Sequence, residues 1–149
     1  KNGSEVARPL QRSLRNIMWE YGGVVKNKEK LEKGLSEIEG LKESSKNLDV
    51  RPDSEGYQDL MLAFDLEASI ASSEATLKSA LNREESRGAH QRDDFKDLSE
   101  NGNVNIRVEL DNNKEIKLSK KEIPQLEKKL KNLINKTVEI DNFEGMLLE

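Results

Sequence analysis

The segment from Tyr57 to Arg87 constrains the fold most, because it is long and repeats apolar residues on two sides at helical spacing. One stripe contains Tyr57, Leu60, Met61, Phe64, Ala68, Ala71 and Ala75, and the other contains Leu62, Leu66, Ile70, Leu77 and Leu81. A helix that is apolar on two sides needs an apolar partner on each side. The sequence therefore predicts that this helix contacts two others.

Two earlier segments supply those partners. Residues 8–21 and residues 28–44 each repeat apolar residues at intervals of three or four, which is typical of an amphipathic helix. Asn27 suits the N-cap of the second helix, and the polar stretch 45–56, which contains proline and glycine, separates it from the third. We therefore expect residues 1–95 to form an antiparallel three-helix bundle, similar to a spectrin repeat.

After residue 95 the pattern changes to that of a short β-structure. Residues 104–110 alternate apolar and polar side chains, as a half-buried strand does. Residues 111–113 have the composition of a turn, and residues 115–118 follow it as a returning strand. The sequence therefore predicts a β-hairpin directly after the bundle.

The remainder of the chain predicts one helix and a further short strand. Residues 119–135 repeat apolar residues as an amphipathic helix does, and residues 137–140 have the composition of a strand. Ser119 and Glu122 have the spacing of a capping box, with Pro124 in the first turn as the alternative helix start. The predicted fold class is mostly α, with a small α+β tail over residues 96–149 that holds the hairpin and one short helix.

Composition excludes several kinds of site. The chain has no cysteine and one histidine, so it cannot build a disulfide, a thiolate nucleophile or a Cys/His metal site. Acidic and basic residues are interspersed and the formal net charge is −4, which argues against a nucleic-acid surface. The sequence contains neither a GxGxxG nor a GxxxxGK[ST] phosphate-binding motif, and no apolar run long enough to span a membrane.

The stretch REESRGAHQRDDF, residues 83–95, concentrates three arginines, the single histidine and four acidic residues. Ser86 and His90 with the following aspartates suggest a catalytic triad, but no nucleophile elbow accompanies them. A helix end is a second interpretation, with Gly88 in a left-handed conformation and Arg83 and Arg87 in the last helical turn. The density of forked arginine donors also suits a docking surface for another domain. The residues alone leave the last two interpretations open.

Two motifs in this chain resemble those of a known enzyme family. Leu14–Val25, LRNIMWEYGGVV, resembles the LR…MWE…G(V/I)VR stretch of the succinate dehydrogenase/fumarate reductase flavoprotein subunit. Ala80–Phe95 resembles that family's AL.REESRGAH.R.DFP motif, with Lys96 where the family usually has proline. The order and spacing of the motifs match over residues 8–95.

The resemblance implies that this chain is the non-catalytic C-terminal helical domain and tail of a larger FAD-dependent enzyme that interconverts succinate and fumarate. It implies no catalytic, cofactor-binding or metal-binding residue in the chain itself, with FAD held upstream in the parent. The same domain of an L-aspartate oxidase is one alternative, because that relative shares a similar ESRG.H.R.D.P motif. An independent helical protein-interaction module is the other alternative.

The resemblance also implies partners. We expect the helical domain to pack on the upstream flavin and substrate domains, and the parent to bind an iron-sulfur subunit in the cytoplasm or at the inner face of a membrane. The residues expected at the interdomain seam are Arg83, Glu85, Ser86, Arg87, Gly88, His90, Arg92 and Asp94. The beginning KNGSEV, without methionine, suggests a piece of a longer protein, and GMLLE suggests a natural chain end.

Overall fold

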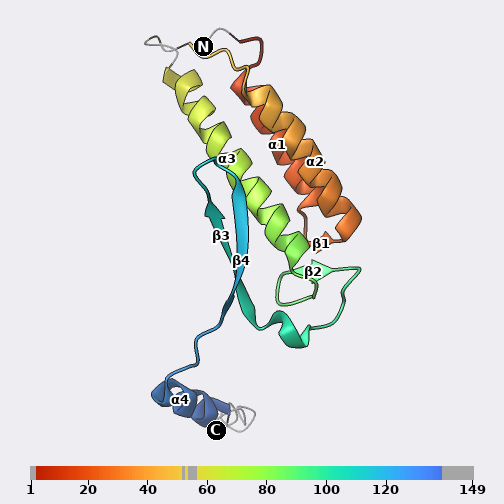
Figure 1. Cartoon of the computed structure of the whole chain (residues 1–149), viewed down its shortest axis with the longest axis vertical. Helices are drawn as coiled ribbons and strands as arrows, with labels where there is room; N and C mark the ends of the chain where they lie inside the picture. Colours follow the sequence, from red (N-terminus) through yellow and green to blue (C-terminus); the bar gives the residue numbers. More distant parts are fainter. Residues whose placement is uncertain (1–2, 52, 54–56, 139–149) are drawn as a thin grey trace, which may run out of the picture.

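The computed structural model describes residues 3–51, 53 and 57–138, and three long helices dominate this part of the chain (Figure 1). They are α1 (Ala7–Tyr21), α2 (Lys28–Ser45) and α3 (Tyr57–Asn82). Each of the three contacts the other two, and two small two-stranded sheets and a short fourth helix follow or connect them. The mostly α fold class with a small β tail is therefore confirmed.

The core lies where the apolar stripes of the three helices meet. Its buried helical residues are Ala7 and Leu14 from α1, Leu31, Ile38 and Leu41 from α2, and Leu66, Ile70, Leu77 and Ala80 from α3. Asn27 caps α2 as predicted, because its side-chain oxygen accepts a hydrogen bond of 2.9 Å from the Lys30 amide. The helical periodicity of the sequence therefore identifies the buried stripe of each helix correctly.

Gly34 of α2 lies where side chains of α1 and α3 both pack closely on α2. A Cβ atom at this position would lie 2.6 Å from Tyr21 Cβ on α1 and 2.8 Å from Leu77 Cδ1 on α3. These distances are shorter than carbon–carbon contacts tolerate, so the absence of a side chain allows the three helices to approach one another. The cost of a glycine within a helix is offset here by packing.

The apolar stripe of α3 that begins at Tyr57 differs from its prediction. The sequence predicts that neighbouring helices cover both stripes, but Tyr57, Met61 and Phe64 are exposed in the structure. The C-terminal half of α3 instead contacts the β-hairpin that follows it, as Figure 1 shows. The stripe is therefore covered by strands in its second half and not by a helix.

The helix α3 also ends earlier than predicted, at Asn82 and not at Arg87. Gly88 does adopt the predicted left-handed conformation, with φ of +58°. It lies in a turn closed by two backbone hydrogen bonds between Arg87 and His90, of 2.8 and 3.0 Å, and not at the helix end. Arg83 and Arg87 therefore follow the helix, and the prediction that they occupy its last turn is wrong.

A short parallel pair of strands, absent from the sequence prediction, joins the start of α2 to the segment after α3 at one end of the bundle (Figure 1). Strand β1 (Val25–Lys26) precedes α2, and strand β2 (Gln91–Arg92) lies within the segment that follows α3. The pair is extended by the Asp93 amide, which donates to the Lys26 carbonyl at 2.8 Å. This pairing fixes residues 83–95 against the start of α2.

The tail contains the predicted hairpin, formed by strands β3 (Val104–Leu110) and β4 (Ile116–Glu122), after a short 3-10 turn, η1 (Glu100–Gly102). The strands are antiparallel, with Val104 opposite Glu122 and Leu110 opposite Ile116. Asp111 shapes the connecting turn, because its carboxylate accepts hydrogen bonds from the amides of Asn113 and Glu115 at 2.8 and 2.9 Å.

The last helix, α4 (Lys128–Val138), begins nine residues later than the predicted start at Ser119. Ser119 and Glu122 lie in β4, so their capping-box spacing is not used. The predicted strand at residues 137–140 is wrong for 137 and 138, which are helical, and its last two residues lie outside the described part of the chain. Among the described helices, none is long and apolar enough to cross a membrane.

Candidate functional site

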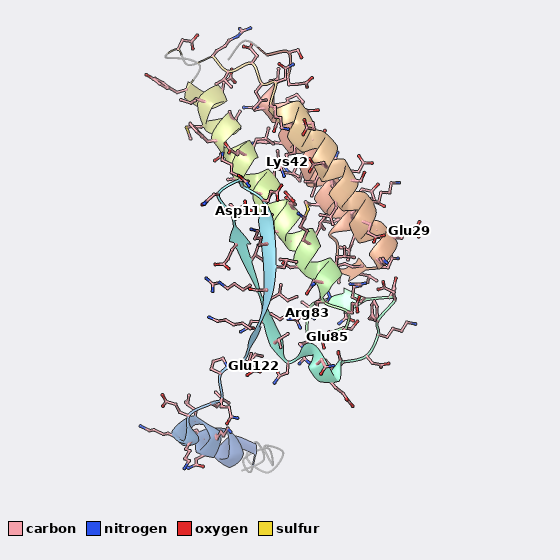
Figure 2. All side chains as sticks on the ribbon, viewed as in Figure 1. Glu29, Lys42, Arg83, Glu85, Asp111 and Glu122 are labelled. Atoms are coloured by element: carbon pink, nitrogen blue, oxygen red, sulfur yellow. The ribbon has the colours of Figure 1, made fainter. Side chains whose placement is uncertain are left out.

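Residues 83–95 gather at the C-terminal end of α3, where the chain turns towards the hairpin. Figure 2 labels Arg83 and Glu85 at this end, beside the base of the strands. All eight residues expected at an interdomain seam lie in this one segment, which packs between α3, β1 and the loop before β3. We call it the arginine segment.

Arg92 is the buried centre of the arginine segment, with only 2% of its surface exposed. Its Nη1 atom donates to the carbonyl oxygens of Ala80 at 2.8 Å and Arg83 at 3.1 Å. Its Nε and Nη2 atoms form a two-pronged pair with Asp94, at 2.7 and 2.8 Å. The guanidinium also lies over the Phe95 ring, 4.9 Å from its centroid. Arg92 therefore satisfies carbonyls at the end of α3 that a further helical turn would otherwise use.

Glu85 is the second buried ion, with 1% of its surface exposed. Its carboxylate accepts hydrogen bonds from Arg83 at 2.5 Å, from two nitrogens of Arg87 at 3.1 Å each, and from the Ser99 amide at 3.0 Å. The hydrogen bond from Arg87, supported by Ser99 and Arg83, lowers the pKa of Glu85 to about 2 although burial opposes ionisation. The buried carboxylate is therefore fully paired and stays charged.

Arg83 connects this ion pair to the hairpin. It donates to the Gly102 carbonyl at 3.0 Å and to the Val104 carbonyl at 2.7 Å, in addition to its bond to Glu85. Gly102 packs so closely on the Glu85 carboxylate that a side chain there would overlap it. The end of α3 and the start of β3 are therefore held together by one arginine.

Ser86 and His90 do not assemble a catalytic pair. The Ser86 hydroxyl donates to the Phe95 carbonyl at 2.8 Å and accepts from the Arg92 amide at 2.8 Å. His90 instead places Nε2 3.2 Å from the Arg83 carbonyl. Burial lowers the pKa of His90, and the positive charges of Lys26, Arg92 and Arg83 act in the same direction. The triad interpretation has no support in this geometry.

The carboxylate of Asp94 ties the arginine segment to α2. It accepts the two-pronged pair from Arg92, which holds the pKa of Asp94 well below its usual range. It also accepts a hydrogen bond of 2.8 Å from the Lys28 amide at the first residue of α2. A carboxylate at a helix N-terminus is favourable because of the free amide groups and the helix dipole.

Backbone groups that the sequence does not mark complete the site. The Ser99 amide, the Gly102 carbonyl and the Lys28 amide all contact its charged side chains. Backbone donors and acceptors are present at nearly every residue, so no residue type identifies them in a sequence. The Ser99 amide and the Gly102 carbonyl also lie after Phe95, where the family motif ends.

The arginine segment does not fit a flavin cradle. In the described residues, every buried side-chain nitrogen or oxygen has a hydrogen-bond partner, and no group of three His, Cys, Asp or Glu residues is placed to hold a metal ion. The buried arginine donors are directed at carbonyls and carboxylates of the same chain. That FAD binds elsewhere in the parent stays a prediction.

Comparison with known proteins finds relatives among FAD-dependent oxidoreductases, fumarate reductases and L-aspartate oxidases. The chain is 36% identical over 97 residues to an uncharacterized FAD-dependent oxidoreductase of Methanocaldococcus jannaschii, covering 65% of this chain and 17% of that protein. It is 31% identical over 93 residues to the fumarate reductase flavoprotein subunit of Proteus vulgaris, covering 62% of this chain and 16% of that protein. L-aspartate oxidases are also among the relatives. The chain thus spans about a sixth of the length of the relatives it matches.

The fold is similar to part of a solved enzyme. A mutant of the Escherichia coli quinol fumarate reductase FrdA matches with a TM-score of 0.77 and 23% identity, covering 85% of this chain and 23% of that one. The sequence profile of the family described as fumarate reductase flavoprotein C-term matches residues 11–142. These residues include most of α1, the other two long helices, the arginine segment and the hairpin. The chain therefore belongs to the fumarate reductase flavoprotein C-terminal family.

Proposed function

We propose that the chain is the non-catalytic C-terminal helical domain of an FAD-dependent flavoprotein that interconverts succinate and fumarate. The observation that carries the proposal is that the arginine segment, which bears the family motif, directs its buried charges at its own chain. Such a segment stabilises the fold, and its paired arginines are not available to bind a flavin or a dicarboxylate. The reacting groups of the parent would then lie in its other domains.

The seam with those domains would lie at the end of the bundle that carries the arginine segment. Arg83 and Arg92 shape this end from within, whereas the Arg87 side chain is 40% exposed. Apolar surface accompanies it, because Val25, which pairs with Gln91 in the β1–β2 pair, and Val24 just before it are both exposed. Exposed apolar groups next to an arginine are typical of interfaces. We propose Arg83, Glu85, Ser86, Arg87, Gly88, His90, Arg92 and Asp94 as the seam, with Arg87 and His90 as the groups that reach across it.

The finer organisation belongs to the same proposal. Residues 1–95 would form one antiparallel, spectrin-repeat-like unit, and residues 96–149 a second unit that holds the hairpin and α4. The hydrogen bonds of Arg83 to both units support a fixed relation between them. An iron-sulfur subunit would be a further partner of the parent, in the cytoplasm or at the inner face of a membrane.

Two alternatives are distinguishable from this proposal. The same domain of an L-aspartate oxidase is supported by relatives of that name. An independent helical interaction module is supported by the exposed apolar face of α3. A GxGxxG motif after a strand in the coding sequence upstream of the first residue would favour a flavoprotein, and a start codon there would favour the module.

The proposal is tested by assaying the parent protein that contains this chain. We expect it to oxidise succinate with an artificial electron acceptor, to reduce fumarate with a reduced dye, and to leave L-aspartate unchanged. Oxidation of L-aspartate with no activity on succinate would support the alternative enzyme. A parent that holds no flavin and shows none of the three activities would contradict both enzyme assignments.

A further inference from the structure

A groove partly lined by the arginine segment has cationic, polar and apolar side chains in its lining and no acidic residue. It lies between the second half of α3, strand β1 and strand β3, and has a volume of about 670 Å³. Lys26, Arg83 and His90 supply basic groups at its edge, and Thr76, Ser79 and Asn105 supply hydroxyl and amide groups. Its remaining lining is apolar, from Ala75, Ala80, Ile106 and Val108.

The carboxylates of Glu85 and Asp94 in the arginine segment do not line this groove and are already paired. Glu85 pairs with Arg83 and Arg87, and Asp94 pairs with Arg92. Lys26, by contrast, has only a single hydrogen bond of 3.2 Å, to the Val24 carbonyl two residues before it, and no acidic partner in the described residues. Lys26 therefore contributes to the lining of the groove a positive charge that no carboxylate of the described residues matches.

His90 is the group that reports on this imbalance. Its Nε2 atom lies 3.2 Å from the Arg83 carbonyl, which can only accept, so Nε2 carries the hydrogen and Nδ1 remains an acceptor. Lys26 from β1, Arg92 from β2 and Arg83 after α3 all disfavour a second proton on this ring, while β3 offers no charged side chain to the groove. An anion in the groove would offset these charges and favour the imidazolium form of the ring, in which both nitrogens are donors.

From this arrangement we propose that the groove between α3, β1 and β3 binds a small oxyanion, a carboxylate or a tetrahedral phosphate-like group, through Lys26, His90 and the polar groups of α3. The polar side chains and the long lysine side chain suit either shape of anion, because none of them imposes a two-pronged geometry. The proposal does not depend on the flavoprotein assignment, since every residue in it belongs to this chain.

The single histidine makes the test direct. The ring-proton NMR signal of His90 is followed against pH in the 149-residue chain, in chloride and in sulfate or acetate at equal ionic strength. We expect sulfate, acetate or both to raise the midpoint by about 0.5 pH unit or more, because a bound anion stabilises the imidazolium. A larger effect of sulfate identifies a tetrahedral anion, and a larger effect of acetate identifies a carboxylate. Identical midpoints in all three salts would overturn the proposal.

Two variants separate specific binding from general screening. Lys26→Gln is expected to raise the His90 titration midpoint in chloride and to abolish the response to sulfate and acetate. Lys28→Gln changes an exposed lysine that does not line the groove. We expect this variant to keep the midpoint and the anion response of the unmodified chain. Asn105→Asp places a carboxylate in the groove and is expected to mimic the bound anion. An equal anion response in the Lys26 and Lys28 variants would contradict the site.

Discussion

Replacing Arg92 with methionine is expected to lower the free energy of unfolding by about 3–5 kcal/mol, because it removes a buried guanidinium that pairs with the partly buried Asp94 and donates to carbonyls at the end of α3. The change leaves the Ala80 carbonyl without its arginine donor in a buried position. It also frees the segment that β2 holds against the start of α2. Urea unfolding followed by circular dichroism at pH 7 measures the loss.

The matched control for this prediction is Arg107→Met on the exposed hairpin. Arg107 also pairs with an acidic residue two positions away, Glu109, but its side chain is 53% exposed. An exposed pair of this kind contributes little, so we expect a change within about 0.5 kcal/mol. Equal losses at the two arginines would show that Arg92 does not organise the end of α3.

The second large effect is expected for Glu85→Gln, at about 2–4 kcal/mol. The amide retains the shape of the side chain but removes the charge that pairs Arg83 and Arg87, and its NH₂ group faces donors. Arg87 is partly exposed and water can replace its partner, which keeps the loss below that at Arg92. Urea unfolding at pH 7 again measures the difference.

The same variant has a defined dependence on pH. The folded-state pKa of Glu85 is lowered to about 2 from an ordinary value of 4.5, so its contribution is fully present above pH 4.5 and is lost as the pH falls from 4.5 towards 2. The difference in stability between the parent chain and Glu85→Gln should therefore shrink over this interval. Glu100→Gln, which changes an exposed acid in the same loop, should show no such convergence. A difference that stays constant down to pH 2 would contradict the assigned role of Glu85.

The long helices follow from the sequence because each buries one stripe at helical spacing. Leu66, Ile70 and Leu77 fall on the stripe that the sequence marks, and all three are buried. The end of α3 cannot be predicted in this way. Local pattern favours helix through Arg87, but the side chain of Arg92, twelve residues after Ala80, takes the carbonyls of the last turn. A long-range contact therefore overrides the local signal.

In the tail, strand pairing likewise overrides a local helical pattern. Helical spacing at residues 119–135 competes with strand pairing, and pairing extends β4 to Glu122 because each of its residues has a partner in β3. Leu118 opposite Val108 is one such pair, and it continues the alternation that the sequence does identify in β3. The register between strands is a property of both segments and is not visible in either one alone.

The sequence locates the segment that forms the candidate site, but it does not show which of its arginine side chains are buried. The arginine density of residues 83–95 suits a docking surface or a helix end, but it does not show that Arg92 lies inside and that Arg83 is mostly covered. Buried arginines are uncommon, so a local pattern favours exposure unless their carboxylate and carbonyl partners are known. The motif resemblance locates the residues, and the three-dimensional contacts show that two of the three arginines hold the segment together.

The central claim is that this chain is a helical domain whose parent binds flavin and dicarboxylate elsewhere. It is tested most directly by isothermal titration of FAD, and separately of succinate, into the 149-residue chain after circular dichroism has verified its helices. We expect no saturable binding of either compound at micromolar concentration. Tight, saturable binding of FAD or of succinate would contradict the claim, because the flavin or substrate site would then lie within these residues.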